Sequence, residues 1–198
     1  MAVITGTGLL IGSNDADTIT INGAASSTVS GLGGDDSITR SVANTTSPDS
    51  IDGGDGNDTI NMSIASSTKG ATIVGGAGND VIAGSVVADN IDGGAGDDLI
   101  IGFNGADTVN GGAGIDTIQA SDGADITALN TALAADGNIV DVEVVDVSGA
   151  TAAVNLNFVN QSEAAGSQLF SLLVLSITPS PVAIRTILSS VLVRGRLL

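Results

Sequence analysis

Aspartates recur at fixed spacing along this chain, and their carboxylates are its main candidates for chemically active groups. From residue 75 onward six of them lie nine residues apart: Asp80, Asp89, Asp98, Asp107, Asp116 and Asp125. Upstream, Asp36, Asp58 and Asp80 are separated by 22 residues, which is two nonapeptides plus four residues. Carboxylates repeated at constant spacing predict a row of hard oxygen ligands for a cation, because a repeating chain places equivalent residues side by side.

The overall composition excludes several classes of function. The 198 residues include 22 acidic residues, 20 of them Asp, against five Lys and Arg, and the net charge is −17. Such a charge argues against binding nucleic acid or an anionic membrane surface, because both need basic residues. The chain has neither Cys nor His, which excludes disulfides, zinc–thiolate sites and imidazole catalysis. With no nucleophile motif either, we predict that the chain is not an enzyme.

Internal repeats account for the aspartate spacing. Four segments fit the pattern G-G-x-G-x-D-x-U-x, where U is a large aliphatic residue: GGDGNDTIN (53–61), GGAGNDVIA (75–83), GGAGDDLII (93–101) and GGAGIDTIQ (111–119). Closely spaced glycines permit a tight turn with exposed carbonyls. The x-U-x part predicts a short strand whose aliphatic side chain points inward. GSNDADTIT (12–20) is a degenerate first copy.

These repeats resemble the RTX (repeats-in-toxin) family of calcium-binding nonapeptide-repeat proteins, also called the hemolysin-type calcium-binding repeat family. The resemblance implies an all-β fold, a right-handed parallel β-roll (a β-solenoid) in which two nonapeptides make one coil. We therefore expect a β-roll over residues 1–127 and a β-rich C-terminal cap over 128–163. The tail, 164–198, is apolar and lacks Asp.

Alternate turns of such a roll lie on opposite edges. The first edge carries the turns that end in Asp17, Asp36, Asp58, Asp80, Asp98 and Asp116. The second edge has Ser27, Asp49, Ala71, Asp89, Asp107 and Asp125 at the same position, in turns that fit the pattern poorly. We expect one well-formed row of cation sites on the first edge and a degraded row on the second.

The resemblance also implies the ligands: in the family, each calcium ion lies between successive turns and is held by backbone carbonyls and motif carboxylates. Carried over by position, the carboxylates are Asp36, Asp58, Asp80, Asp98 and Asp116. The carbonyl donors are Gly53, Gly54, Asp55 and Gly56, then Gly75, Gly76, Ala77 and Gly78, then Gly93, Gly94, Ala95 and Gly96, and finally Gly111, Gly112, Ala113 and Gly114. Four sites follow, with a fifth open between Asp17 and Asp36, so that four or five Ca²⁺ ions are expected. Soft metals are disfavoured because the chain offers them no thiolate or imidazole.

Several residues outside this ligand set carry their own expectations. Four-residue inserts after Thr39 and Asn61 are predicted to lengthen one strand, with Ile38 and Val42 facing inward and Arg40 between them as an exception. Phe103, which replaces a turn glycine, is expected at the surface or covering an edge. The residues just before the motif Asp, such as Asp35 and Asn57, are expected to shape the turns rather than bind metal.

The C-terminal part carries less information. A helical start is expected over 128–135, followed by alternating strand-like segments over 138–149 and 151–160 that cap the open end of the roll. Pro179 and Pro181 interrupt the uncharged stretch of the tail, which argues against a membrane span. The tail is either a C-terminal signal for type I secretion, which the resemblance suggests, or a non-native, out-of-frame end.

Three functions remain at this stage. The first is calcium binding by a bacterial RTX β-roll, secreted or at the cell surface, which folds when Ca²⁺ binds. The second is a structural or adhesive fragment of a surface-layer protein or adhesin, with cell-surface polysaccharide or self-association as its partner. The third is the non-catalytic RTX module of a secreted enzyme or toxin.

Overall fold

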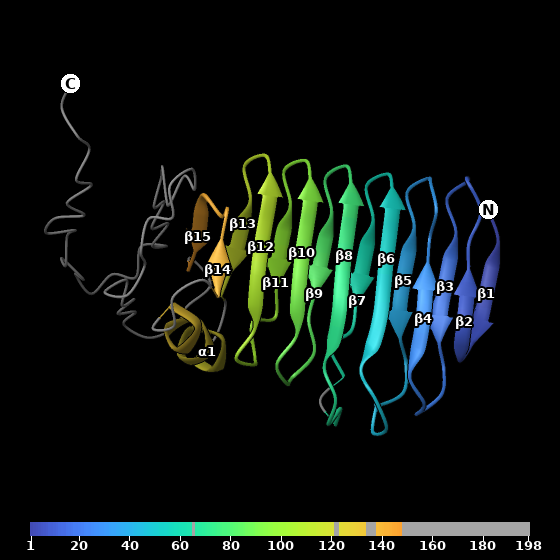
Figure 1. Cartoon of the computed structure of the whole chain (residues 1–198), viewed down its shortest axis with the longest axis horizontal. Coiled ribbons are helices and arrows are strands. Elements are labelled where there is room, and N and C mark those ends of the chain that lie inside the picture. The colour runs from blue at the N-terminus through green and yellow to red at the C-terminus, as the bar shows by residue number, and fades with distance from the viewer. Residues whose placement is uncertain (65, 121–122, 134–137, 148–198) are drawn as a thin grey trace, which may run out of the picture.

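Two parallel β-sheets face each other in the computed structural model, which describes residues 1–64, 66–120, 123–133 and 138–147 (Figure 1). The chain alternates between the sheets, so each coil adds one strand to each of the two sheets. The expected all-β solenoid is therefore confirmed.

One sheet has eight strands and the other seven. The first comprises β1 (Val3–Gly6), β3 (Thr18–Ile21), β5 (Ser37–Arg40), β7 (Thr59–Asn61), β9 (Val81–Ala83), β11 (Leu99–Ile101), β13 (Thr117–Gln119) and β15 (Val144–Asp146). The second comprises β2 (Gly8–Ile11), β4 (Ser27–Ser30), β6 (Asp49–Asp55), β8 (Ala71–Ala77), β10 (Asn90–Ala95), β12 (Thr108–Ala113) and β14 (Ile139–Val140). All pairings between neighbouring strands are parallel, and equivalent repeat residues face one another, as Ile60, Ile82 and Ile100 do.

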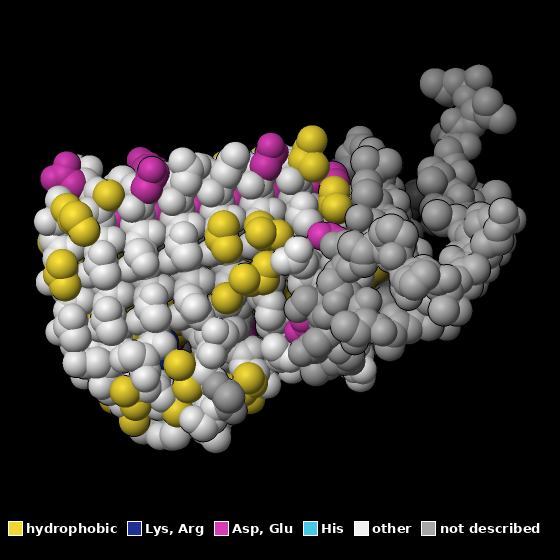
Figure 2. Space-filling view, turned by 180° about the vertical axis from the view of Figure 1, so that it is seen from behind, with side chains coloured by type: hydrophobic (Ala, Val, Ile, Leu, Met, Phe, Trp, Pro, Cys, Tyr) yellow, Lys and Arg dark blue, Asp and Glu magenta, His cyan; other side chains and the backbone are white. Residues whose placement is uncertain are grey.

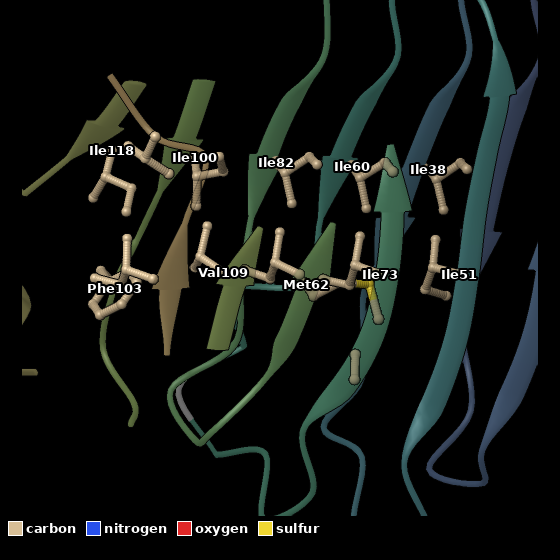
Figure 3. Close-up of a cluster of buried hydrophobic side chains, with 14 of the residues drawn as sticks. Ile38, Ile51, Ile60, Met62, Ile73, Ile82, Ile100, Phe103, Val109 and Ile118 are labelled. Carbon is tan, nitrogen blue, oxygen red and sulfur yellow. The ribbon is translucent and has the colours of Figure 1, made fainter. Parts of the chain in front are cut away.

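The core is a double row of aliphatic side chains between the two sheets (Figure 3). Each strand contributes the aliphatic residue of its repeat, because alternate residues of a strand point to opposite faces of the sheet. One row comprises Ile19, Ile38, Ile60, Ile82, Ile100, Ile118 and Val145. The facing row comprises Leu10, Val29, Ile51, Ile73, Ile91, Val109 and Ile139.

The four-residue inserts do not lengthen a strand, contrary to the expectation from the sequence. β5 has four residues and β7 only three. Arg40 ends β5, and the other described residues of the inserts lie in loops of the second edge. Ile38 and Arg40 both point inward, whereas Val42 is exposed. The inserts widen the loops instead of the strands, because β6 and β8 pair in register with each other.

Phe103 also departs from the expectation, since its side chain is fully buried rather than at the surface. It belongs to the same buried cluster as the aliphatic rows, and Figure 3 draws it near Ile118. The same core cluster includes Leu129 and Ala132 of the helix α1 (Gly123–Leu133). Helix and strand side chains thus share one core cluster with the ring.

α1 begins five residues before the expected helical start, so Asp125 and Thr127 lie in the helix rather than in a last repeat strand. Within the expected strand segment 138–149, β14 and β15 add one strand to each sheet. The expected strand at 151–160 and the tail 164–198 lie outside the described residues. In the part of the chain that the structure describes, no helix is long and apolar enough to cross a bilayer.

Candidate metal-binding edge

The first edge consists of the six repeat turns that carry the chain from the seven-stranded sheet to the eight-stranded sheet, and the short loop between β14 and β15 follows them. All 21 residues predicted as ligands lie in these turns or at the strand ends beside them. Exposed acidic side chains, those of Asp15, Asp35, Asp55 and Asp97, also line this rim (Figure 2). The motif aspartates are different, because the side chains of Asp17 to Asp116 on this edge are buried.

The motif aspartates form a continuous hydrogen-bonded ladder along the edge. The backbone N–H of Asp36 donates to Oδ1 of Asp58 at 2.7 Å, and that of Asp58 donates to Oδ1 of Asp80 at 2.7 Å. The same bond joins Asp80 to Asp98 and Asp98 to Asp116, at 2.8 Å each. One oxygen of each carboxylate is thus used to fasten a turn to the turn before it.

The second oxygen of each carboxylate has no hydrogen-bond partner although it is buried. This holds for Oδ2 of Asp36, Asp58, Asp80, Asp98 and Asp116. A buried carboxylate oxygen without a partner is costly, so native proteins satisfy such atoms with a donor or a cation. Five such oxygens along one edge make this edge suited to binding positive charge.

Backbone carbonyls converge on these free oxygens. Oδ2 of Asp58 and the carbonyl oxygen of Gly75 lie so close to Gly53 that a Cβ there would collide with both. The same collision arises at Gly75, with Asp80 Oδ2 and the carbonyl of Gly93. Each gap between turns is therefore lined by oxygen from both turns, and only glycine leaves room for it.

The other predicted carbonyl donors lie in the same turns. The carbonyls of Ala77, Ala95 and Ala113 accept hydrogen bonds from the N–H groups of Gly56, Gly78 and Gly96, at 2.7 to 2.8 Å. The second glycine of each turn has a positive φ, for example 119° at Gly76, where a Cβ would collide with the carbonyl of Gly54. The turns thus stack backbone on backbone with their carbonyls held in fixed places.

Burial raises the pKa of these carboxyl groups. It is the largest cause of the raised pKa of Asp58 and Asp116, to about 6, and of Asp80, to about 7. The pKa values of Asp36 and Asp98 are also raised, again mainly by burial. Neighbouring carboxylates add to the effect, since like charges disfavour ionisation.

The donor set fits calcium. Among the described residues no three acidic side chains gather in one place, so side chains alone do not make a metal site. Mixed carbonyl and carboxylate oxygens at the gaps suit the flexible, oxygen-rich coordination that Ca²⁺ prefers, and suit Mg²⁺ less well because it keeps its waters in a small octahedron.

Asp17 differs from the other motif aspartates because its carboxylate is already satisfied. Oδ2 accepts bonds from the N–H and the hydroxyl of Ser13, at 2.7 and 2.8 Å, and Oδ1 accepts from the N–H of Ala2. These bonds, that of Ala2 foremost, lower the pKa of Asp17. The gap between Asp17 and Asp36, where the sequence left a fifth ion open, therefore lacks the free oxygen found at the other gaps.

On the second edge, the carboxylate of Asp89 is satisfied in the same way, by a serine of its own turn. Ser85 donates its N–H to Oδ2 at 2.5 Å and its hydroxyl to Oδ1 at 3.1 Å. Both turns have the sequence G-S-x-x-A-D, with serine in place of the second glycine. Sequence reasoning overlooked this signal: a serine at that position supplies the carboxylate with donors from its own turn.

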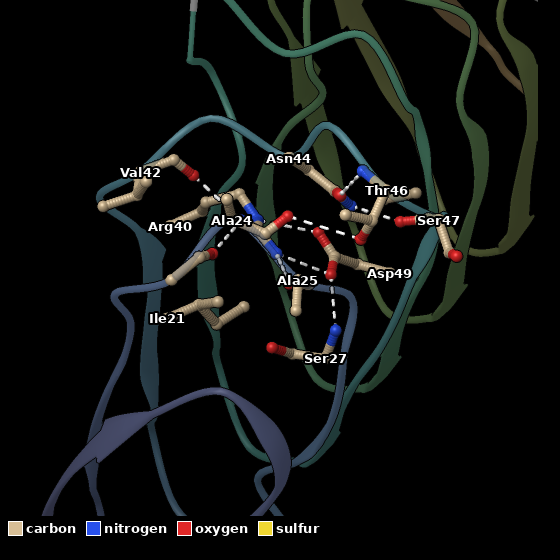
Figure 4. Close-up of polar contacts among 12 residues, drawn as sticks. Ile21, Ala24, Ala25, Ser27, Arg40, Val42, Asn44, Thr46, Ser47 and Asp49 are labelled. Carbon is tan, nitrogen blue, oxygen red and sulfur yellow. Dashed lines mark hydrogen bonds and ion pairs between the residues drawn. The ribbon is translucent and has the colours of Figure 1, made fainter.

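Arg40 supplies positive charge to the second edge from within the chain (Figure 4). Asp49 holds the position of a motif aspartate on this edge. As in the first-edge ladder, its Oδ1 accepts a backbone N–H, that of Ser27, at 2.7 Å. The guanidinium of Arg40 bridges both oxygens of Asp49, Nε to Oδ2 and Nη2 to Oδ1, at 2.7 Å each. Nη1 and Nη2 also donate to three backbone carbonyls, those of Gly23, Ala25 and Val42.

Asp107, farther along the second edge, keeps a buried Oδ2 without a partner, and burial raises its pKa to about 7. The second edge is thus not uniform. Ser85 donates hydrogen bonds to Asp89 and Arg40 pairs with Asp49, whereas Asp107 has a free buried oxygen like the motif aspartates of the first edge. The degraded row of cation sites expected on this edge stays a prediction.

The residues just before the motif Asp form an outer ladder on the first edge. The N–H of Asn57 donates to Asp35 Oδ1 at 2.8 Å, that of Asn79 to Asn57 Oδ1 at 2.7 Å, and that of Asp97 to Asn79 Oδ1 at 2.9 Å. Their side chains therefore link one turn to the next and are occupied by backbone donors.

Comparison with family models agrees with this architecture. The model for the RTX calcium-binding nonapeptide repeat matches four copies, at residues 45–61, 70–100, 84–118 and 101–127. No curated protein and no solved structure matches the chain. The repeats of this chain within residues 45–127 are therefore similar to the RTX calcium-binding nonapeptide repeat.

Proposed function

We propose that the first edge binds four Ca²⁺ ions, one in each gap between the turns that end in Asp36, Asp58, Asp80, Asp98 and Asp116. Each gap offers a free Oδ2 and the carbonyl of the first glycine of the next turn, and the other predicted carbonyls lie in the turns beside the gaps. The observation that carries the proposal is the row of buried carboxylate oxygens without hydrogen-bond partners.

Calcium binding and folding are coupled in this proposal. Without cations, buried carboxylates lie one above another along the thin roll, and both desolvation and mutual repulsion oppose folding. A cation in each gap removes this cost and binds the folded chain alone, so its binding free energy adds to the free energy of unfolding. The roll then needs calcium to be stable.

A calcium titration tests the proposal directly. In excess chelator the β-type circular dichroism of the full chain is expected to be lost, and to return cooperatively as Ca²⁺ is added, with calorimetry counting the ions. Equimolar Mg²⁺ should restore little. A chain that keeps its β-sheet spectrum in chelator and takes up no calcium would contradict the proposal.

The pH dependence of the calcium-free chain provides a second test. The folded pKa values of Asp58, Asp80 and Asp116, about 6 to 7, lie above the ordinary value of 3.8, so the folded state binds more protons than the unfolded state between these limits. Their contribution favours folding at low pH and is lost as pH rises through 6 to 7. In chelator, we expect β structure to appear on acidification from pH 7.5 to pH 5, followed by circular dichroism at low protein concentration. Identical spectra at the two pH values would contradict the raised pKa values.

A secreted or cell-surface location follows from the same coupling. A chain that folds only with several Ca²⁺ ions stays unfolded where calcium is scarce and folds where it is abundant, as outside the cell. In this proposal the role of the chain is binding calcium and holding a rigid shape, as a free module or as part of an adhesive or secreted protein, and not catalysis.

A further inference from the structure

The last coil of the roll is built from residues outside the repeats but keeps their register. β14 and β15 continue the two sheets, with Asn110 paired to Val140 and Thr117 paired to Val144. This register sets Asp141 in the place of Gly111 and Glu143 in the place of Asp116. The six-residue turn of the repeats is reduced here to three residues, and a positive φ of 48° at Asp141 lets the chain reverse at once.

Glu143 continues the ladder of the first edge. Its Oε2 accepts the backbone N–H of Asp116 at 2.8 Å, the same length as the bond that Asp116 Oδ1 accepts from Asp98. Glutamate is one methylene longer than aspartate, and this extra reach suits the shorter turn. The carboxylate of Glu143 contributes to the raised pKa of Asp116, although burial is the larger cause.

A free oxygen and a carbonyl meet in the gap between Asp116 and this loop. Oδ2 of Asp116 is fully buried and has no hydrogen-bond partner. The carbonyl oxygen of Asp141 lies so close to Gly111 that a Cβ there would collide with it, and such a Cβ would lie 2.7 Å from Asp116 Oδ2. The gap thus has the elements found at each gap between repeats, namely a free Oδ2, a carbonyl from the next turn and a glycine that leaves space.

We propose that this gap is a further Ca²⁺ site, formed by Asp116, the carbonyl of Asp141 and the carboxylate of Glu143 with carbonyls of the turn 111–114. The inference rests on the proposed calcium binding of the repeats. It moves the fifth ion from the start of the ladder, where Ser13 satisfies Asp17, to its end. The ion fastens the segment after the repeats to the roll.

The test compares the full chain with Glu143→Gln by calorimetry and by hydrogen exchange with and without Ca²⁺. Glu143→Gln keeps an oxygen that can accept the N–H of Asp116 but removes the charge. We expect it to bind one Ca²⁺ fewer than the unchanged chain, and to lose calcium-dependent protection at residues 139–146 while protection of the repeats at 53–119 is kept. Asp52→Asn removes one charge from an exposed position on β6 and serves as the control. It should change neither the number of ions nor the protection.

The outcomes separate this inference from the proposed function. If the chain binds no calcium at all, calcium binding by the repeats fails, and this site with it. If the chain binds calcium and Glu143→Gln binds the same number with the same protection at 139–146, the repeats are a calcium module but this gap is not a site. A loss of protection without loss of an ion also overturns the inference, because Glu143 would then act only as a hydrogen-bond acceptor.

Discussion

Replacing Arg40 by methionine is expected to lower the free energy of unfolding by about 3–5 kcal/mol, even in saturating calcium, because the change leaves Asp49 as an unpaired buried charge. The Arg40 side chain is 2% exposed, and it satisfies both oxygens of Asp49 and three backbone carbonyls at once. Urea unfolding followed by circular dichroism measures the change.

The double variant Arg40→Met with Asp49→Asn identifies the cause. The amide introduced by Asp49→Asn would keep an oxygen for the N–H of Ser27 but carry no charge, so the double variant should recover a large part of the lost stability. If the double variant is no more stable than Arg40→Met, the loss comes from the three carbonyls that Arg40 leaves without a donor. A loss below about 1 kcal/mol for Arg40→Met would mean that the ion pair is not important for the roll.

Gly76→Ala is expected to destabilise the calcium-loaded roll by about 3–5 kcal/mol. Two effects combine at this position. The φ of 119° lies outside the region that residues with a Cβ adopt, and the added Cβ would collide with the carbonyl of Gly54 in the turn below. The stacked turns would have to separate, and the oxygens that line the gap would separate with them. Urea unfolding at saturating calcium and the calcium affinity from calorimetry are the measurements.

Gly102→Ala is the matched control. Gly102 also has a positive φ, but at 67° it lies in the left-handed helical region, and the nearest atom to an added Cβ is 3.9 Å away. The backbone cost alone should be about 1–2 kcal/mol. Equal losses in Gly76→Ala and Gly102→Ala would show that close stacking of the first-edge turns does not matter to stability.

The repeat spacing predicts the architecture well, because each nonapeptide makes the same turn and strand. The assignment of turns to two edges and the inward rows of Ile60, Ile82 and Ile100 both follow from a constant period. A period of this kind determines register, and register determines which residues become neighbours. The phase recovered across the 22-residue spacings places Asp36 and Asp58 on the same edge as Asp80, as the structure has them.

The departures come from residues that break the period. Phe103 replaces a turn glycine, and the sequence does not reveal that helix α1 brings further apolar side chains to the same core cluster. The pairing of Arg40 with Asp49 could have been predicted. Arg40 lies two residues after the inward-pointing Ile38 and so faces the core as well. Asp49 holds the position of a motif aspartate in a turn that lacks the glycines of the repeat pattern. The role of Glu143 was hidden by the loop length, since the repeat pattern requires six residues where the chain uses three.

The ladder of motif aspartates runs in one direction only, and this gives the roll two chemically different ends. Each coil donates an N–H to the carboxylate of the coil that follows it, from Ala2 into Asp17 at one end to Asp116 into Glu143 at the other. A coil in the middle finds an acceptor for its N–H in the next coil and a donor for its carboxylate in the coil before it. Because the ladder has a direction, a coil within it finds both hydrogen-bond partners in other coils, whereas the first carboxylate needs a separate donor and the last N–H a separate acceptor.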